Sequence, residues 1–250
     1  MTAYYDSYDY PLYWEGREYE HQSEVHAINE FLKKIPKIKT ILEIGAGYGR
    51  LTPIYYYRSA KVILTDPSSK ILKIAKNNLK NKKIKYIQSK LENLPNKIRA
   101  HSVNLIVLVR VLHHIEDLDF AFSTINNLLT QKGYFLLEYA NKRHLKALFS
   151  ELFHGNLMFL LDIFPKEVKS KKRIKYKLPF RNYNPDLIRE KLYKNGFKII
   201  DTRSVSNIRS PFLKKLIPLD LLLFIEKILQ KPFSGIYLGP SMFVLAKKVN

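Results

Sequence analysis

A glycine-rich loop and a carboxylate further along the chain are the residues best suited to chemistry on a ligand. Residues 42–50 read Leu-Glu-Ile-Gly-Ala-Gly-Tyr-Gly-Arg and end a short apolar run. Glycines let the backbone turn sharply and approach a ligand, and the amides at a helix N-terminus favour a negative group such as a carboxylate. Asp66 follows Gly45 by about 20 residues, where nucleotide-binding βαβ units place their ribose-binding acid. The pattern predicts a site for an anionic ligand that carries a ribose.

On these residues the chain resembles class I S-adenosylmethionine-dependent methyltransferases (EC 2.1.1). The rival interpretation is a nicotinamide dehydrogenase, because the spacing to Asp66 serves both families. A G-x-G-x-x-G dinucleotide site needs a small third residue for close helix packing, whereas this chain has Arg50 there and its third glycine one position earlier, at Gly49. The arrangement favours a methyltransferase, and the resemblance implies S-adenosylmethionine as the cofactor.

The resemblance assigns cofactor-binding roles to residues of this loop and of the next strand end. Glu43 matches the acid that orders the loop and helps place the methionine part of the cofactor; the alternative is a carboxylate at the surface end of a strand. Pro67 falls where the family packs an apolar group on the adenine face. The cofactor-binding residues predicted from these two segments are Glu43, Gly45, Ala46, Gly47, Gly49, Asp66 and Pro67.

A third segment, residues 88–95 (Gln-Ser-Lys-Leu-Glu-Asn-Leu-Pro), resembles the family's loop beside adenine. Many relatives have an acid there that accepts from the adenine amino group, but this chain has Lys90, which carries only donors. We expect either stacking and backbone contacts near Leu91, or an alignment displaced by one residue. Lys90 and Leu91 are retained as predicted cofactor neighbours.

The fourth-strand segment 108–115 (Leu-Val-Arg-Val-Leu-His-His-Ile) is similar to an element of small-molecule methyltransferases related to ubiquinone-pathway enzymes. The resemblance places Val109 beside the amino-acid part of the cofactor. His113 and His114 could take a proton from an acceptor, since an imidazole titrates near neutral pH. Packing or capping is the favoured interpretation of this pair, so no catalytic base is named.

Several reaction classes lack the residues they need. The chain has no cysteine, which excludes disulfides, thiolate metal sites and cysteine nucleophiles, including the one that RNA cytosine C5 methylation requires. Residues 109–112 do not resemble the Asp/Asn-Pro-Pro-aromatic element of enzymes that methylate base amino groups. No His/Asp/Glu grouping has metal-ligand spacing, so we expect no metal.

The elements that must position these residues alternate along the chain. The sequence predicts strands at 40–44, 61–65, 84–88, 103–109, 134–139, 197–200 and 242–245. Helices are predicted at 20–35, 50–58, 117–129 and 185–194, and another after the cap at 66–69. This order predicts a Rossmann-like, doubly wound, seven-stranded, mainly parallel sheet in an α/β fold, with helical insertions after strands 5 and 6.

We expect residues 1–250 to form a single methyltransferase domain. Residues 1–37 would supply an aromatic lid and a helix, with Arg17 near the cofactor carboxylate; simple anchoring of the N-terminus is weighed equally. The lid tyrosines and tryptophan are Tyr4, Tyr5, Tyr8, Tyr10, Tyr13, Trp14 and Tyr19. The insertions at 141–184 and 205–240 should flank the acceptor, because they open on the carboxyl side of the sheet.

The composition points to an anionic partner without choosing one. The formal net charge is +21, and a basic run covers residues 166–181. Apolar helices beside that run suggest a pocket for a lipophilic, anionic acceptor or peripheral contact with an anionic membrane, against the alternative of core or dimer packing. The oligomeric state stays open. No secretory signal begins the sequence, so a cytoplasmic location is expected.

Three functions remain open, in decreasing order of preference. The first is methyl transfer to a small-molecule or lipid acceptor, with the acceptor atom (O, N or C) undefined. An RNA methyltransferase is the second, because the basic run could follow a phosphate backbone. The third is a protein that binds the cofactor without catalysis.

Overall fold

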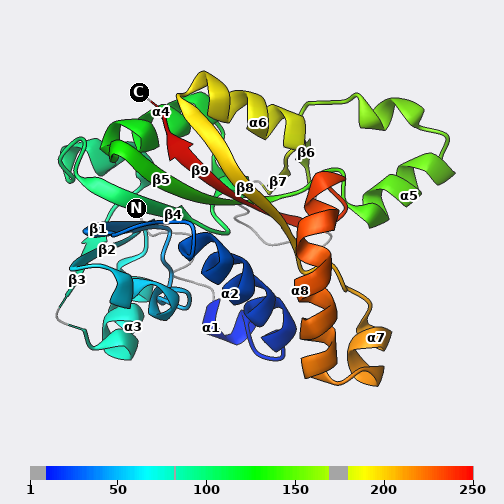
Figure 1. Ribbon diagram of the computed structural model, residues 1–250, viewed down its shortest axis with the longest axis horizontal. Helices are drawn as coiled ribbons and strands as arrows, with labels where there is room; N and C mark the ends of the chain where they lie inside the picture. Colours follow the sequence, from blue (N-terminus) through cyan, green and yellow to red (C-terminus); the bar gives the residue numbers. More distant parts are fainter. Residues whose placement is uncertain (1–9, 82, 169–179, 250) are drawn as a thin grey trace.

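A seven-stranded sheet with the order β3-β2-β1-β4-β5-β9-β8 forms the centre of the protein (Figure 1). The computed structural model describes residues 10–81, 83–168 and 180–249. Strands β1 to β5 are parallel, and β9 lies antiparallel between β5 and β8. The strands are β1 (Thr40–Ile44), β2 (Lys61–Asp66), β3 (Ile84–Gln88), β4 (Val103–Leu108), β5 (Leu129–Ala140), β8 (Phe197–Val205) and β9 (Ser241–Lys248). The predicted seven-stranded, mainly parallel sheet is confirmed.

Helices cover both faces of the sheet, which explains why its central strands are apolar on both sides. On one face α2 (Glu18–Leu32) and α3 (Ser69–Leu79) pack on β1, β2 and β4. On the other face lie η4 (Leu91–Asn96), α4 (Leu118–Leu128) and α6 (Pro185–Lys194). Polar caps start three of them: Ser68, Asp117 and Asn184 each accept a backbone N–H with a side-chain oxygen.

The prediction of a helix at residues 50–58 is wrong. Two short 3-10 turns stand there, η2 (Thr52–Ile54) and η3 (Tyr56–Arg58). The backbone leaves helical geometry at Tyr55, whose φ is −131° and whose ring is fully buried in the core. Burial of this side chain outweighs the local helical pattern, because a tyrosine ring removes a large apolar area from water.

The two insertions leave the sheet at adjoining points. The first holds α5 (Leu145–Phe153), η6 (Leu157–Leu160) and the strand pair β6 (Lys166–Glu167) and β7 (Arg181–Asn182); the second holds α7 (Pro211–Leu216) and α8 (Leu219–Gly235). Their bases are joined by backbone bonds from Asn141 N to Pro240 O (2.9 Å) and from Leu145 N to Leu238 O (2.8 Å). The buried Asn141 amide also donates to Tyr237 O and Gly239 O. The insertions are therefore tied together where they leave the sheet.

A single turn, α1 (Tyr10–Tyr13), precedes α2. Tyr4, Tyr5 and Tyr8 of the predicted lid lie outside the described residues, as does most of the basic run, 169–179. Among the helices that the structure describes, none combines the length and the apolar character needed to cross a bilayer.

Candidate functional site

The glycine loop after β1 is held in a conformation that side chains would prevent. Gly45, Gly47 and Gly49 have φ of 70°, 56° and 79°, a region that glycine adopts without strain. A Cβ on Gly45 would stand 2.2 Å from Val111, which follows β4. The Ala46 amide donates to the carbonyl of Thr65 on β2 at 2.9 Å. The loop is thus fixed against the ends of both neighbouring strands.

Asp66 ends β2 and faces this loop. Its two carboxylate oxygens accept the amides of Gly47 (3.0 Å) and Ser68 (2.8 Å), and the residue is 6% exposed. These bonds fix the carboxylate against the glycine loop. Its position matches the predicted ribose-binding acid.

Glu43 lies beneath the loop, not at the surface end of its strand. It is 5% exposed and accepts a hydrogen bond from the Thr52 hydroxyl at 2.7 Å. Burial raises the pKa of Glu43 to about 7, and the nearby Tyr55 hydroxyl and the hydrogen bond from Thr52 oppose the rise. This geometry suits the predicted role of ordering the loop, which stays a prediction as regards the cofactor.

A buried carboxylate with two arginines adjoins the loop; we call Glu24, Arg50 and Arg110 the arginine cluster. Glu24 on α2 is fully buried and pairs with Arg50 (2.5 Å) and Arg110 (2.5 Å). Burial alone would raise the pKa of Glu24, but the guanidinium groups of Arg110 and Arg50 outweigh it and hold the pKa below its ordinary value. One carboxylate faces two cations, so the cluster carries a net positive charge.

Trp14 lies against the arginine cluster. The guanidinium carbons of Arg50 and Arg110 lie 3.4 and 4.8 Å from its ring centroid, as in cation–π contacts. Its Nε1 is buried with no acceptor among the residues that the structure describes. Arg17 instead lies over Tyr13, at 4.1 Å, so the arginines beside the loop are Arg50 and Arg110. An N–H donor and two cations meet here, and an anionic group is their natural ligand.

The remaining predicted cofactor residues end β2, β3 and β4 on the same side of the sheet. Pro67 is half-buried, and its carbonyl accepts from Gln88 at the end of β3. Leu91 is buried at the start of η4, whereas the side chain of Lys90 is exposed. Val109 is buried in the apolar cluster that includes Ala46. The structure therefore brings all ten predicted residues to one edge, with the side chain of Lys90 exposed there.

The histidine pair after β4 is packed against the first insertion. His113 is 8% exposed and stacks on Phe180, with centroids 4.3 Å apart. Burial, followed by the nearby His114 and Arg110, lowers the pKa of His113 well below its ordinary value. A neutral, weakly basic imidazole fits the packing interpretation. Within the described residues no group of three or more His, Asp or Glu side chains could hold a metal ion.

Sequence reasoning missed Glu24, Arg110 and the position of Trp14. A signal for Glu24 was present: it lies on the same helical face as Ala27, Ile28 and Phe31, all of them buried. A carboxylate on an apolar face needs a cationic partner. The sequence could not show which arginine provides it, because Arg110 is far from Glu24 along the chain.

Comparisons with known proteins agree with this geometry. Residues 42–137 match the family model described as "Methyltransferase domain". The Saccharomyces cerevisiae protein named "Probable S-adenosylmethionine-dependent methyltransferase CRG1" is 31% identical over 101 residues, which cover 39% of this chain and 34% of the yeast protein. This chain thus matches about a third of that relative's length.

Solved structures share the fold over nearly the whole chain. A Thermotoga maritima protein described as "SAM-dependent methyltransferase, possible histamine N-methyltransferase" has a TM-score of 0.65 at 16% identity, covering 96% of this chain and 95% of that one. A chain from the complex between the Haloferax volcanii Trm112 methyltransferase activator and a methyltransferase has a TM-score of 0.63 at 12% identity, covering 98% and 96%. At such identities the likeness concerns the fold.

Gly45→Ala should destabilise the protein more than an alanine at another glycine with positive φ. Gly155 has φ of 73° and open space around its Cβ position, whereas the Cβ at Gly45 would overlap Val111. We expect Gly155→Ala to cost about 1–2 kcal/mol from backbone strain and Gly45→Ala about 1–3 kcal/mol more from overpacking. Urea unfolding of both variants measures the difference, and equal costs would contradict the close approach.

Glu43 should make stability depend on pH. Its pKa is raised from the ordinary 4.5 to about 7 in the folded protein, so the folded state keeps a proton that the unfolded chain has lost. Stability from this group therefore falls as pH rises from about 4.5 to 7, by up to about 3 kcal/mol. Glu43→Gln removes the titration, and its unfolding free energy relative to wild type should rise over this range. Glu92→Gln, at an exposed position on η4, is the control for the substitution itself.

Proposed function

We propose that this chain, which carries a methyltransferase domain of the class I S-adenosylmethionine-dependent type over residues 42–137, transfers a methyl group to a small, lipophilic acceptor. One observation carries the proposal: the glycine loop, Asp66 and the arginine cluster meet at the carboxyl ends of β1, β2 and β4. Open α/β folds bind their ligands at this edge.

The comparisons support the more general predictions made from the sequence. The family match confirms a methyltransferase domain over residues 42–137. Together with the yeast relative it supports the enzyme class and S-adenosylmethionine as the cofactor. The ubiquinone-pathway subclass, the acceptor and the cytoplasmic location stay predictions.

The residues present fit this cofactor. We assign the ribose hydroxyls to Asp66, which is buried at the end of β2 against the glycine loop, and the methionine carboxylate to Arg50, Arg110 and the buried Trp14 Nε1. Pro67 and Leu91 would line the adenine, with a backbone contribution at Lys90. Gly45, Ala46, Gly47 and Gly49 would let the cofactor approach the backbone, with Glu43 beneath them and Val109 on the β4 side.

Methyl transfer requires little from the protein beyond alignment of the acceptor with the cofactor. The cofactor supplies an activated methyl group on a sulfonium, and the protein must hold an acceptor in line with it and exclude water. His113 is a weak base because its pKa is depressed, so we assign it no proton transfer. Acceptors that are nucleophilic when neutral suit this site best.

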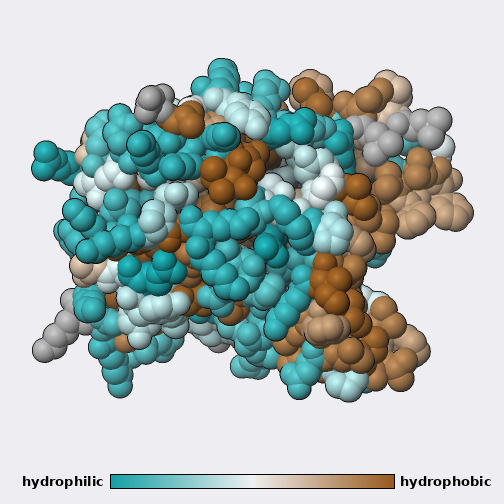
Figure 2. All heavy atoms as spheres, viewed as in Figure 1, coloured by the Kyte–Doolittle hydropathy of each residue, from teal (hydrophilic) through white to brown (hydrophobic). Residues whose placement is uncertain are grey.

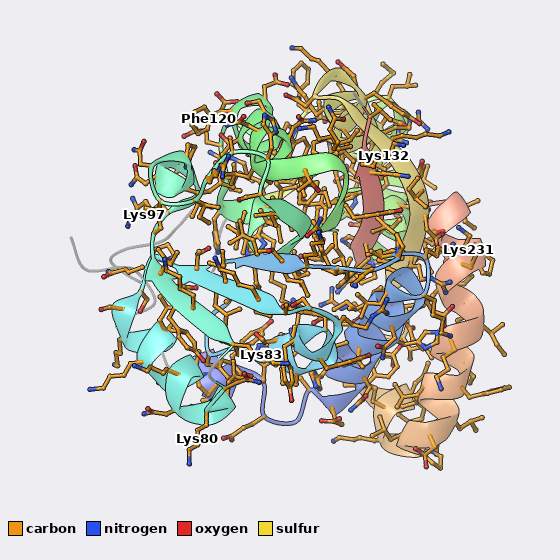
Figure 3. The ribbon with its side chains drawn as sticks, turned by 60° about the vertical axis from the view of Figure 1, so that its left-hand side comes forward. Lys80, Lys83, Lys97, Phe120, Lys132 and Lys231 are labelled. Carbon is orange, nitrogen blue, oxygen red and sulfur yellow. The ribbon has the colours of Figure 1, made fainter. Side chains whose placement is uncertain are left out.

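The insertions support a lipophilic acceptor. Both leave the sheet beside its carboxyl edge and expose large apolar side chains, among them Phe149 and Phe224. Positive charge, by contrast, is spread widely: Lys80, Lys83 and Lys97 lie on the side of α3 and η4, and Lys231 lies on α8 (Figure 3). RNA methylation remains the second candidate, because a basic exterior attracts phosphates in general.

Calorimetric titration tests the cofactor assignment. Wild type should bind S-adenosylmethionine and not NAD, and Asp66→Ala should weaken binding by about tenfold or more, because a buried carboxylate bond to a hydroxyl is lost. Asp220→Ala, at an exposed position on α8, is the control and should bind normally. Binding of NAD alone, or of neither ligand by the folded protein, would refute the assignment.

Labelled methyl donor with separate lipid, small-molecule and RNA extracts tests the acceptor. Label should pass to the lipid or small-molecule fraction, and at limiting methyl donor the yield of product should fall with Asp66→Ala. Labelled RNA would favour the second candidate. Cofactor binding without transfer to any fraction would favour a non-catalytic binding protein.

A further inference from the structure

Helix α8 has its polarity reversed relative to a helix that covers the core of a soluble protein. Glu226, Gln230 and Ser234, spaced four residues apart, are buried. Glu226 accepts from Tyr19 Oη (2.6 Å), and Gln230 donates to the carbonyl of Ser23 (2.9 Å), so the polar stripe is fixed against α2. Leu222 is the one large apolar side chain of the described helix that is buried with them, whereas Leu219, Leu221, Phe224 and Ile228 are exposed.

The outward stripe continues onto α7. Phe224 is 60% exposed and Phe212 on α7 is 70% exposed. We call this surface the α7–α8 face, and its exposed apolar residues are Phe212, Leu213, Leu216, Leu219, Leu221, Phe224 and Ile228. Figure 2 shows these helices as brown side chains gathered at one edge of the molecule. Apolar patches of this kind mark contact with a partner or a membrane.

A second apolar group projects from the same edge. It lies on the first insertion, and Phe153 is 89% exposed. We call it the α5 lobe; its exposed apolar residues are Leu145, Phe149, Leu152, Phe153, Met158, Leu161, Ile163 and Phe164. The base of the lobe is bonded to the segment that follows α8, and both groups lie on the same side in Figures 1 and 2.

The charges around the α7–α8 face and the α5 lobe indicate what kind of partner binds there. Arg209, Lys215 and Lys227 are exposed at or beside the α7–α8 face, and the chain carries a formal charge of +21. A second copy would bring the same cations against them, which costs free energy, whereas anionic lipid headgroups would be attracted. Apolar side chains with flanking cations are also the composition of helices that lie in a bilayer interface.

We propose that the α7–α8 face and the α5 lobe together seat this protein on the surface of an anionic membrane. The apolar side chains enter the boundary between headgroups and acyl chains, and the exposed cations contact the headgroups. The carboxyl edge of the sheet, from which both insertions leave, then lies near the lipid. Docking does not depend on methyl transfer, and it deepens the proposed function by giving a lipophilic acceptor a route to the site.

Co-sedimentation with vesicles tests the docking. The intact chain should sediment with mixed phosphatidylcholine–phosphatidylserine vesicles, less with phosphatidylcholine alone, and less as salt rises. The double variant Phe212→Gln/Leu216→Gln should bind the mixed vesicles about tenfold or more weakly, because two exposed apolar side chains no longer insert. The double variant Lys215→Gln/Lys227→Gln should reduce the difference in binding between the mixed vesicles and the vesicles of phosphatidylcholine alone.

A matched control separates docking from general stickiness. Phe120 is 45% exposed on α4, an element remote from α8 (Figure 3), so Phe120→Gln should bind vesicles like wild type. Calorimetric binding of S-adenosylmethionine by the Phe212→Gln/Leu216→Gln variant should be unchanged, which keeps a failure of docking distinct from a failure of the cofactor site. Docking is refuted if wild type ignores anionic vesicles, if the double variant binds them as well as wild type, or if the double variant only dissociates a dimer.

Discussion

The pairing of Glu24 with Arg50 and Arg110 is the interaction on which the candidate site depends. It joins α2, the end of the glycine loop and the turn that follows β4, three segments far apart in the sequence. Removing one partner of a buried pair leaves an uncompensated charge, at a cost of about 3–5 kcal/mol. The cluster therefore fixes where the leading helix lies, and with it Trp14, whose ring lies over Arg50.

Arg110 also connects the arginine cluster to strands on the other side of the sheet. Arg110 has φ of 59°, unusual for a residue with a side chain, and its amide donates to Glu138 on β5 at 2.7 Å. Glu138 also accepts from the Ser241 hydroxyl on β9. Such strain persists only where surrounding contacts hold it, as they do here on both the side chain and the backbone. A shift of α2 would therefore also disturb the hydrogen bonds that Glu138 makes with Arg110 and with Ser241 on β9.

The sequence predicted most of what depends on local pattern. The seven strands, the helix cap within residues 66–69, and the convergence of the glycine loop with Asp66 all follow from hydrophobic periodicity and turn chemistry. The structure departs from that pattern where a distant contact decides: burial of Tyr55 replaces a helix by 3-10 turns, and Glu24 finds partners on other segments. The reversed polarity of α8 also escaped prediction, since an apolar helical stripe has the same sequence whether it faces the core or the outside.

The position of β9 bears on the order in which the sheet can be completed during synthesis. β8 pairs with β9 and, among the described strands, with no other, yet it precedes β9 along the chain and is separated from it by α7 and α8. A ribosome therefore delivers β8 before the strand that joins it to β5 exists. Until residues 241–248 emerge, the outer edge of β5 is an open edge on which wrong pairings can form. The parallel strands β1 to β5 can assemble early. The sheet is completed only when β9, the last strand to be synthesised, inserts between β5 and β8.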